Sequence, residues 1–465
     1  MSSKVVVVGI GLIGIQVLEE LIESGVKPHD ITVIDPNVSK SQTQEVSSSK
    51  SRELRHVYYR NKVNDGLSKK ELGLKDLHLL DKSQTYYWGA SCLPPMRFEI
   101  PNSGYGSNEI RQAYGKVTES IGVQATFSSI SEEINFPYTE EVIGRLQRKQ
   151  LANEWVNSSN GKVYHSRLAI STSAKSGCTF QGNCFEGCPN NSIWNPSNHV
   201  SKAKEALQAL KHLEARVVSI DLSKHLVVTS NNEQVKYERL ILTAGPNSTA
   251  QIVSSIFPDR QIKVKTSPVV LLPFFTRKCA PMDDFKSHFV TTDLLVPSLN
   301  EDGLSAITQI YLPTSEIAGR VLLQAPRIAS ELLLRMPFKS IEYLMRHIGI
   351  AMVFAPGYES DLNPKKVKKI MKDPIAQVRK VLAQNGAELL LEPRRYILNH
   401  DSHHSGSIYE MRDGIANSGL NSRVYSSLRD QNVHLLDSSL LPQIPPGPHT
   451  LTAASLARLE IRRHE

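Results

Sequence analysis

The first 35 residues constrain the fold of this chain most strongly. Residues 5–8, VVVV, form an apolar run that predicts a buried strand, and this run leads straight into GIGLIG and an apolar-periodic helix. In such a turn Gly9 allows the tight bend, Gly11 lets backbone amides approach a pyrophosphate, and Gly14 lets helix and strand pack closely. Asp35 ends the next strand about twenty residues on, where a carboxylate accepts hydrogen bonds from ribose hydroxyls. The segment predicts a dinucleotide-binding domain without distinguishing NAD from FAD.

Length and hydropathy narrow the class of protein. A chain of 465 residues can form two or three compact units, or one interleaved two-domain protein with a large core. It contains no run of about eighteen apolar residues, so we expect no transmembrane helix. The N-terminus lacks a positive region followed by a cleavable apolar segment, so we expect a cytoplasmic protein.

The net charge of +8 is spread along the chain, with short basic clusters at 365–369 and 462–464. Because no aromatic residues are interleaved with these cations in a nucleic-acid-binding signature, nucleic acid is not an expected partner. A moderately basic surface favours an anionic substrate or partner instead. The segment 317–350 reads as a basic helix broken at Pro326 and Pro337, which predicts either an ordinary covering helix or peripheral membrane contact.

The middle of the chain indicates two sheets. A strand pair at 214–221 and 226–229 precedes a third strand in YERLILTAG, residues 237–245. Strands alternate with helices in this half, which is typical of an α/β domain built in discontinuous pieces. Short apolar, β-like runs between 263 and 296 predict a second sheet.

Two polar clusters stand near the C-terminus. Residues 432–462 read as a short strand, then Asp437, then a turn rich in proline and glycine, then His449 and a helix. Upstream, His403 and His404 begin the run HHSGS. These clusters and the N-terminal turn together resemble the glucose–methanol–choline (GMC) family of flavin oxidoreductases, in which the N-terminus holds FAD and the C-terminus brings two polar residues to the flavin.

This resemblance implies a fold and a division into domains. The fold class is α/β, with a discontinuous Rossmann-like FAD-binding domain and a smaller, trimmed substrate domain of sheet and helices. The predicted FAD-binding domain comprises residues 1–100, 166–262 with the cysteine loop, and 396–465. The predicted substrate domain comprises residues 101–165 and 263–395.

The resemblance also implies FAD contacts. YERLILTAGPNST is similar to the family's strand that ends in Ala-Gly beside the FAD pyrophosphate, and Trp88-Gly89-Ala90 resembles the loop under the flavin, with Ala90 in place of a second glycine. Val217 or Val218 stands where the family places a valine backbone against the adenine. Asp437 fits a ribityl or pyrophosphate contact, and it also fits an ordinary turn aspartate. The implied cofactor-binding residues are Gly9, Gly11, Gly14, Asp35, Trp88, Gly89, Ala90, Val217, Ala244, Gly245, Asp437 and Thr450.

Oxidation of an alcohol by hydride transfer requires a base for the hydroxyl proton, and histidine has a suitable pKa. HHSGS is similar to the family's motif for this base, which makes His403 the candidate, with His404 as a competitor. His449 resembles the second polar position, which holds the substrate oxygen. The alignment can slip by one onto Pro448, but a proline nitrogen has no hydrogen to donate.

Three cysteines, Cys178, Cys184 and Cys188, fall within eleven residues as C-x5-C-x3-C. Cysteines this dense in a reducing compartment indicate metal or redox chemistry. The same spacing occurs in the GMC branch with glucose and glucoside dehydrogenases, which implies a [3Fe–4S] cluster. Cys92 is a candidate fourth ligand for a larger cluster, zinc with His199 is an alternative, and the thiols can also be structural.

The sequence therefore predicts an FAD-dependent dehydrogenase that oxidises a primary or secondary alcohol of a sugar or glycan, a lipid-linked one included. Electrons would leave through the cluster to an acceptor protein or quinone, and the enzyme would be cytoplasmic with peripheral contact at the inner face of the membrane. One alternative is an alcohol or sugar oxidase that uses oxygen. A second is a non-catalytic flavin-binding redox sensor.

Overall fold

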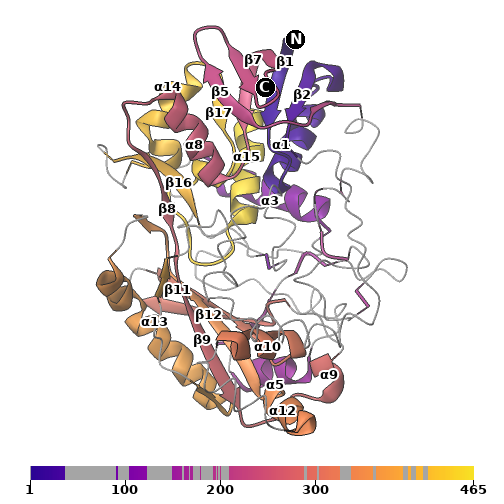
Figure 1. Cartoon of the computed structure of the whole chain (residues 1–465), viewed down its shortest axis with the longest axis vertical. Coiled ribbons are helices and arrows are strands. Elements are labelled where there is room, and N and C mark those ends of the chain that lie inside the picture. Colours follow the sequence, from indigo (N-terminus) through magenta and orange to yellow (C-terminus); the bar gives the residue numbers. More distant parts are fainter. Residues whose placement is uncertain are drawn as a thin grey trace.

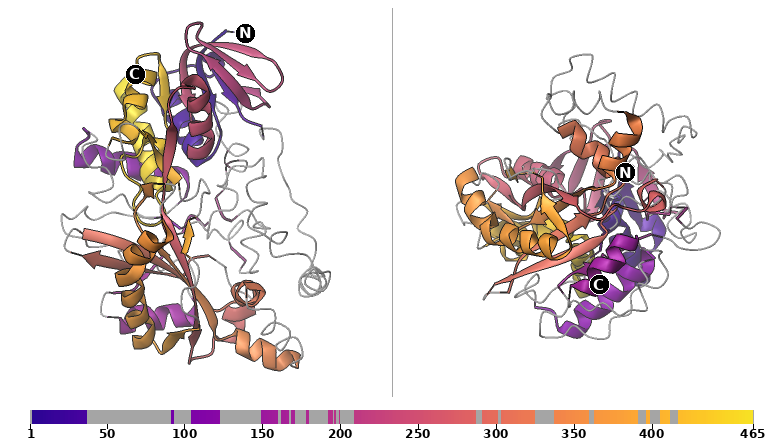
Figure 2. Two further views of the ribbon diagram at one scale, coloured as in Figure 1. Left: turned by 60° about the vertical axis from the view of Figure 1, so that its left-hand side comes forward. Right: turned by 90° about the horizontal axis from the view of Figure 1, so that it is seen from below.

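A computed structural model describes the parts of the chain on which the following account rests. These are residues 2–36, 91–92, 104–122, 149–159, 162–166, 168–170, 178–179, 192–194, 196, 199, 209–286, 291–300, 303–324, 337–359, 363–390, 396–398, 405–411 and 417–464. The described elements form two lobes along the long axis, each built around one large sheet, and both termini lie in the same lobe (Figures 1 and 2). We call the lobe with the termini the first domain and the other lobe the second domain.

The sheet of the first domain is mainly parallel, in the order β4-β2-β1-β7, with β17 pairing beside β7. The hairpin β5–β6 joins the other half of β7 antiparallel, because β7 is long enough to pair with β6 at one end and with β17 at the other. The strands are β1 (Ser2–Val8), β2 (Ile31–Ile34), β4 (Lys211–Leu213), β5 (Val217–Asp221), β6 (Leu226–Thr229), β7 (Gln234–Leu242) and β17 (Val433–Leu435).

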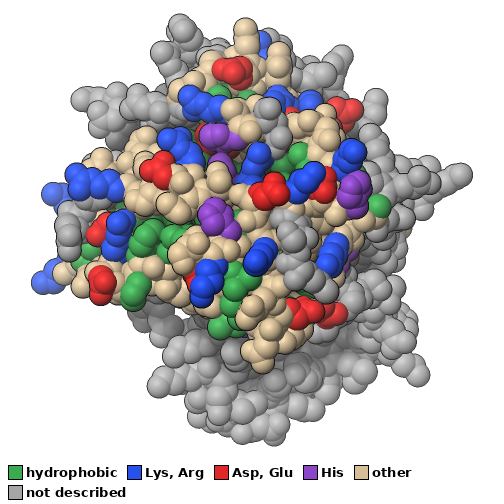
Figure 3. All heavy atoms as spheres, turned by 90° about the horizontal axis from the view of Figure 1, so that it is seen from above, with side chains coloured by type: hydrophobic (Ala, Val, Ile, Leu, Met, Phe, Trp, Pro, Cys, Tyr) green, Lys and Arg blue, Asp and Glu red, His purple; other side chains and the backbone are tan. Residues whose placement is uncertain are grey.

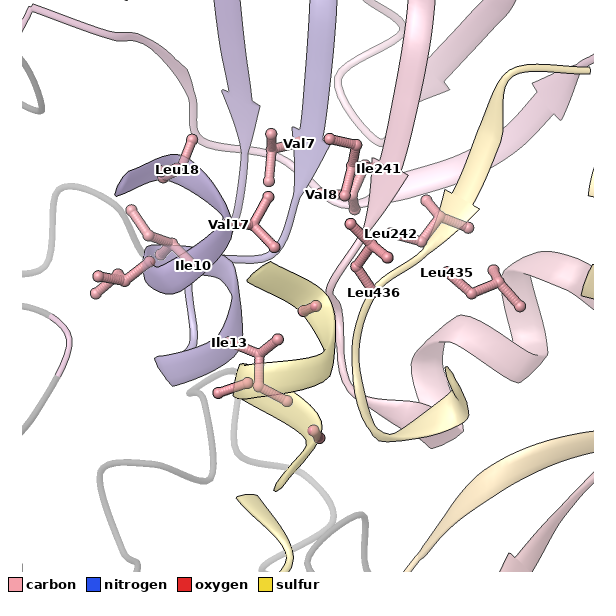
Figure 4. Packing of buried hydrophobic residues seen from close by; sticks show 14 of the residues in the cluster. Val7, Val8, Ile10, Ile13, Val17, Leu18, Ile241, Leu242, Leu435 and Leu436 are labelled. Carbon is pink, nitrogen blue, oxygen red and sulfur yellow. The ribbon is translucent and has the colours of Figure 1, made fainter. Parts of the chain in front are cut away.

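Apolar side chains of the central strands make the core of this domain. Val7, Ile241 and Leu435 come from three neighbouring strands, and Ile13 and Val17 come from the helix that follows the glycine turn (Figure 4). All of these side chains are buried. Parallel strands that are buried on both faces consist of continuous apolar runs, so VVVV and LIL could be recognised as strands from the sequence.

Helices cover this sheet. They are α1 (Leu12–Glu23), α3 (Ser107–Ser120), α8 (Pro246–Ile256), α14 (Arg423–Arg429) and α15 (Thr450–His464), with the short 3-10 turns η1 (Pro28–Asp30), η6 (Gly419–Asn421) and η7 (Ser438–Leu440). The C-terminal helix α15 contacts both α1 and α3. Nearly every residue of α15 from Leu451 to Ile461 is buried, so the C-terminus is an integral part of the first domain.

The second domain is an antiparallel sheet in the order β14-β9-β12-β11-β10-β3, with β15 also beside β9. Its strands are β3 (Tyr164–His165), β9 (Pro268–Thr276), β10 (Leu294–Asn300), β11 (Gly303–Tyr311), β12 (Ile348–Phe354), β14 (Ala387–Leu389) and β15 (Tyr396–Leu398). Its helices are α5 (Gln150–Ser158), α9 (Met282–Lys286), α10 (Ser315–Gln324), α12 (Phe338–Met345) and α13 (Pro364–Gln384). The range 101–165 thus supplies α3 to the first core and α5 to the second.

The expected helix at 317–350 is wrong at its C-terminal end. Within its described parts α10 and α12 are helical, but Ile348 begins β12, the strand between β9 and β11. The run IGIAMVF is short and apolar, and periodicity alone does not distinguish a buried strand from a buried helix.

A small third sheet connects the two domains. Strand β8 (Ile262–Thr266) pairs with β16 (Ser405–Glu410) on one side and with β13 (Tyr358–Glu359) on the other. One residue, Ser267, separates β8 from β9, so a nearly continuous strand passes from the first domain into the second. Within the part of the chain that the structure describes, no helix is both long and apolar enough to cross a bilayer.

Candidate functional site

The glycine turn after β1 is shaped by close backbone contacts. Gly9 has a φ of +98°, and a Cβ there would lie 2.6 Å from the Thr243 carbonyl oxygen. A Cβ on Gly14 would lie 2.2 Å from the Gly9 carbonyl oxygen. Real Cβ atoms do not approach backbone oxygens so closely, so both positions require glycine and hold the start of α1 tightly against the strand ends.

Two polar side chains fix this turn from neighbouring strands. The Ile10 amide donates to Asp35 Oδ2 over 2.8 Å, which ties the turn to the residue after β2. The Thr243 hydroxyl lies 2.9 Å from the Val8 carbonyl oxygen and 2.7 Å from that of Gly9, so it ties the turn to the end of β7. Sequence reasoning missed Thr243, although it stands directly before the Ala-Gly pair that was identified.

The N-terminus of α1 faces the same region. Gly11 is its N-cap residue and, having no side chain, makes no side-chain cap, and the first helical turn carries no acidic residue. Backbone amides at such a helix end favour a phosphate group. Gly9 and Gly14 thus have the turn and the close packing that the sequence predicted, and phosphate binding at Gly11 stays a prediction.

The C-terminal segment reaches the same edge of the sheet. Strand β17 runs parallel to β7, and Asp437 follows it just as Ala244 and Gly245 follow β7. Gly245, with a φ of +87°, is the N-cap residue of α8. Because the carboxyl ends of parallel strands meet at one edge, the predicted residues Gly9, Gly245 and Asp437 lie at the same edge of the first sheet.

Asp437 accepts hydrogen bonds from protein donors on both carboxylate oxygens. The Thr249 hydroxyl donates to Oδ2 over 2.5 Å and the Ser439 amide to Oδ1 over 2.8 Å. Burial raises the pKa of this carboxyl, and the hydrogen bonds from Ser439, Thr249 and the Gly245 amide act in the opposite direction. The structure thus shows Asp437 holding η7 against α8, and its predicted contact with FAD stays a prediction.

His449 is buried immediately before α15. Its carbonyl accepts the Ala453 amide over 3.0 Å, and its Nδ1 lies 3.4 Å from the Gly447 carbonyl oxygen. Gly447 has a φ of +95°, a conformation that suits glycine in the turn leading to His449. The predicted partner His403, with its competitor His404, lies outside the described residues.

The strand that begins two residues after His403 is nevertheless placed. Strand β16 contacts η7, and a Cβ on Gly406 would lie 2.8 Å from the Ser438 carbonyl oxygen. Ser407, at a φ of +51°, lies at the irregularity between Gly406 and Ile408. Strand β16, which follows His403, is therefore adjacent to η7, which ends nine residues before His449.

Several buried hydroxyls in this region lack partners among the described residues. They belong to Ser407 in β16, Ser439 in η7, Thr266 at the end of β8 and Ser267 at the domain junction. Buried polar atoms without partners are uncommon in native proteins, and a bound ligand or water is a usual explanation.

Lys265 is a further buried polar residue that the sequence did not predict. It lies in β8 opposite Gly406, and its Nζ donates to the Pro442 carbonyl over 3.0 Å. Burial lowers the pKa of its ammonium group to about 8. The alternation in IKVK places both lysines on the face opposite Ile262 and Val264, which predicts exposure, so no signal in the sequence indicated the burial of Lys265.

The cysteine loop is mostly outside the described residues, including Cys184 and Cys188. Cys178 is half-buried against the core of the first domain, and Cys92 is buried within that core. No group of three or more potential metal ligands occurs within the described ranges. His199, the alternative zinc ligand, has Nδ1 3.1 Å from Trp194 Nε1 and Nε2 2.7 Å from Glu19 Oε1, so both ring nitrogens are engaged.

Some of the remaining predicted cofactor residues lie within the described part of the chain and others lie outside it. Trp88, Gly89 and Ala90 lie outside the described residues. Val217 is half-buried against the first core, whereas Val218 is 60% exposed. Ala244 and Thr450 are half-buried beside the strand and helix ends described above. The structure brings the glycine turn, the Ala-Gly pair, Asp437 and His449 into one domain, and binding by them stays a prediction.

No protein-family model matches this sequence, and no curated protein matches it. Solved structures do resemble the computed one. A pyridoxine 4-oxidase from Mesorbium loti has a TM-score of 0.55 at 11% identity, covering 99% of each chain. A formate oxidase from Aspergillus oryzae RIB40, whose structure concerns FAD modification, has a TM-score of 0.54 at 10% identity, covering 100% of this chain and 98% of the other.

The chain has the fold of these two oxidases. The likeness extends over the whole chain, through both sheets and the segment between them. The predicted α/β fold class is confirmed. At such low identity the comparison shows the fold alone.

Proposed function

We propose that this chain is an FAD-dependent oxidoreductase that oxidises a CH–OH group. The observation that carries the proposal is the convergence of the glycine turn, the α8 N-terminus and the His449 segment at one edge of a mainly parallel sheet. The fold shared with two flavin-dependent oxidases supports it.

The residues present fit a dinucleotide. Gly9 and Gly14 let the turn pack against the strand ends where no Cβ fits, and the α1 end offers amides without a side-chain cap. Asp35 and Gly245 lie beside it on the neighbouring chain segments, and unpartnered buried hydroxyls lie further along. Bound FAD would supply the acceptor for the hydride of the alcohol carbon.

The protein's own contribution is proton handling and orientation. In this proposal His403 takes the hydroxyl proton of the substrate and His449 holds the substrate oxygen, because neutral imidazole both accepts and donates hydrogen bonds near neutral pH. His449 has a fixed backbone, since its carbonyl begins the hydrogen-bond ladder of α15. The Cα of His449 is therefore held in a fixed position at the buried N-terminal end of that helix.

A more specific part of the proposal concerns the class of substrate and the route by which electrons leave the flavin. We propose a sugar or glycan as the alcohol, with Cys178, Cys184 and Cys188 holding a [3Fe–4S] cluster that passes electrons to a protein or quinone. The support is the C-x5-C-x3-C spacing and the resemblance to cysteine-bearing sugar dehydrogenases. Iron and acid-labile sulfide in anaerobically purified protein test this part independently of flavin reduction.

The second candidate is an oxidase in which the cysteines are structural. It is favoured by the names of both structural neighbours, which are oxidases. Anaerobic mixing with a panel of sugars and alcohols, followed at the flavin absorption band, tests the oxidoreductase itself. Substrate-dependent peroxide formation on admitting air would select the oxidase, and reduction without peroxide would select the dehydrogenase. A flavin that no alcohol reduces would contradict both.

A further inference from the structure

Helix α13 packs one face into the second domain and leaves the other to solvent. Val367, Met371, Val378 and Leu382 lie in the second core, while the opposite side of the helix is exposed. Asn363 caps the N-terminus by accepting the Lys365 amide over 2.8 Å. The helix lies on the outside of the second domain in both views (Figures 1 and 2).

The exposed face of α13 carries most of the net charge of the molecule. We call this face the lysine stripe; it consists of Lys365, Lys366, Lys368, Lys369, Lys372, Arg379 and Lys380. Asp373 is the single acid in the helix. Seven cations and one acid leave a net of six positive charges, against +8 for the whole chain. The other 444 residues together carry a net charge of only +2.

The charges concentrate toward the N-terminal end of the helix. Five of the seven fall within its first nine residues, and Arg379 and Lys380 follow after a gap of two turns on a helix about 30 Å long at about 1.5 Å per residue. The remaining exposed positions of the helix include Ala376, Ala383 and Gln384. The stripe therefore has no aromatic or large apolar side chain.

The lysines of the stripe lack ion pairs within the described residues. None of its six lysines forms an ion pair with any residue that the structure describes. Some lysines elsewhere are paired, as Lys116 is with Glu23 and Lys278 with Glu154, whereas others in the described part of the chain, such as Lys27 and Lys236, are not. At the opposite end of the molecule, Lys and Arg side chains are intermingled with Asp and Glu (Figure 3).

We propose that the lysine stripe docks this protein on an anionic lipid surface. Protein interfaces are depleted in lysine and enriched in arginine and aromatic residues, the reverse of this composition. Single-stranded nucleic-acid sites add aromatic platforms, which the stripe also lacks. Lipid headgroups require no directional recognition, and clusters of four to eight basic residues on a helix attract anionic bilayers. Because the stripe has no large apolar side chain, the contact is electrostatic and does not insert into the bilayer.

The proposal does not depend on the activity proposed above. It also differs from membrane contact through 317–350, because α10 and α12 contribute no comparable stripe: their basic residues within the described ranges are Arg320 and Lys339. The contact would place the outer side of the second domain against the bilayer and leave the first domain away from it.

Co-sedimentation of the full-length protein with vesicles tests the proposal. The probes are phosphatidylcholine vesicles with and without about one third phosphatidylglycerol, at low and at high salt. The test variant replaces Lys365, Lys366, Lys368 and Lys369 by glutamine. The matched control replaces Lys4, Lys27, Lys211 and Lys236, all exposed and in the first domain, by glutamine, so that both variants lose the same charge.

We expect binding only to the anionic vesicles, lost at about 1 M salt, where the screening length falls to about 3 Å. The test variant should bind at least about tenfold more weakly, and the control should bind within about twofold of the wild type. Because all eight lysines are exposed, both variants should keep the wild-type unfolding temperature. Failure to bind anionic vesicles, or equal losses in both variants, would overturn the proposal. Stripe-dependent binding to an acidic protein instead of vesicles would replace the lipid by a protein partner.

Discussion

At the scale of single residues, the glycine turn after β1 is the part of the site that the sequence predicted best. Gly9, Gly14 and Asp35 act within one local strand-turn-helix-strand unit, so their spacing in the sequence alone predicts their geometry. Thr243 forms a hydrogen bond with Gly9, more than two hundred residues away in the sequence. Lys265 forms one with Pro442, more than a hundred residues away. Nothing in their local sequence indicates these partners.

Gly14→Ala should destabilise the protein and reduce the flavin that it retains. The new Cβ would lie 2.2 Å from the Gly9 carbonyl oxygen, so α1 must shift, at a cost of about 1–3 kcal/mol. Urea unfolding and flavin content measure both effects. Gly115→Ala is the control: nothing lies within 4 Å of that Cβ in α3, so stability should stay equal or rise. Equal behaviour of the two variants would contradict the turn geometry.

His449→Gln should slow flavin reduction by substrate roughly 10²–10³-fold while FAD stays bound, because the substrate oxygen would lose a positioned hydrogen-bonding group. The backbone role of His449 at the start of α15 is independent of its side chain, so the fold should persist. Anaerobic stopped-flow absorption measures the reduction rate. His29→Gln, at a side chain that is 74% exposed, is the control and should be silent. A wild-type rate in His449→Gln would remove this residue from the site.

Lys265 should make stability depend on pH above neutrality. Its pKa is about 8 in the folded protein and near 10.5 when solvated. Below pH 8 the lysine is charged in both states and its burial cost is fully present. Between about 8 and 10.5 the folded state loses the proton first, so this residue makes the free energy of unfolding rise with pH. Urea titrations at pH 8 and pH 10 should show a smaller rise for Lys265→Met, and an unchanged rise would contradict the assignment.

At the scale of elements, long-range ion pairs attach the C-terminal helix to the N-terminal one. Arg458 of α15 is fully buried and pairs with Glu19, Glu20 and Glu23 of α1. The sequence predicted both helices but not this contact, because the partners lie more than 430 residues apart. The β12 strand was missed for a related reason: its state is decided by pairing with β9 and β11.

Arg458→Ala should destabilise the protein by roughly 3–5 kcal/mol, since Glu20 would keep a buried charge with only the partly exposed Arg462 and the more distant Lys116 as partners. Denaturant unfolding measures the change. Lys116→Ala removes an exposed partner of Glu23 that also lies 4.0 Å from Glu20, and it should cost no more than about 1 kcal/mol. Similar costs for the two variants would show that the buried cluster does not hold α15 in place.

At the scale of the whole molecule, the chain passes repeatedly between two domains. The first domain takes β1, β7 and β17 from the beginning, middle and end of the sequence, and the Ala-Gly pair and His449 come with them. The fold class was predictable because each of these pieces has its own local pattern. The assembly of the pieces was implied only by a family resemblance, and the likeness to two oxidase structures supports it at the level of the fold.

The central claim is that this assembly holds FAD. The most direct measurement is the absorption spectrum of the purified protein, repeated on the supernatant after denaturation. We predict flavin bands in the native protein and about one FAD per chain in the supernatant. A colourless protein that also fails to take up added FAD would contradict the account.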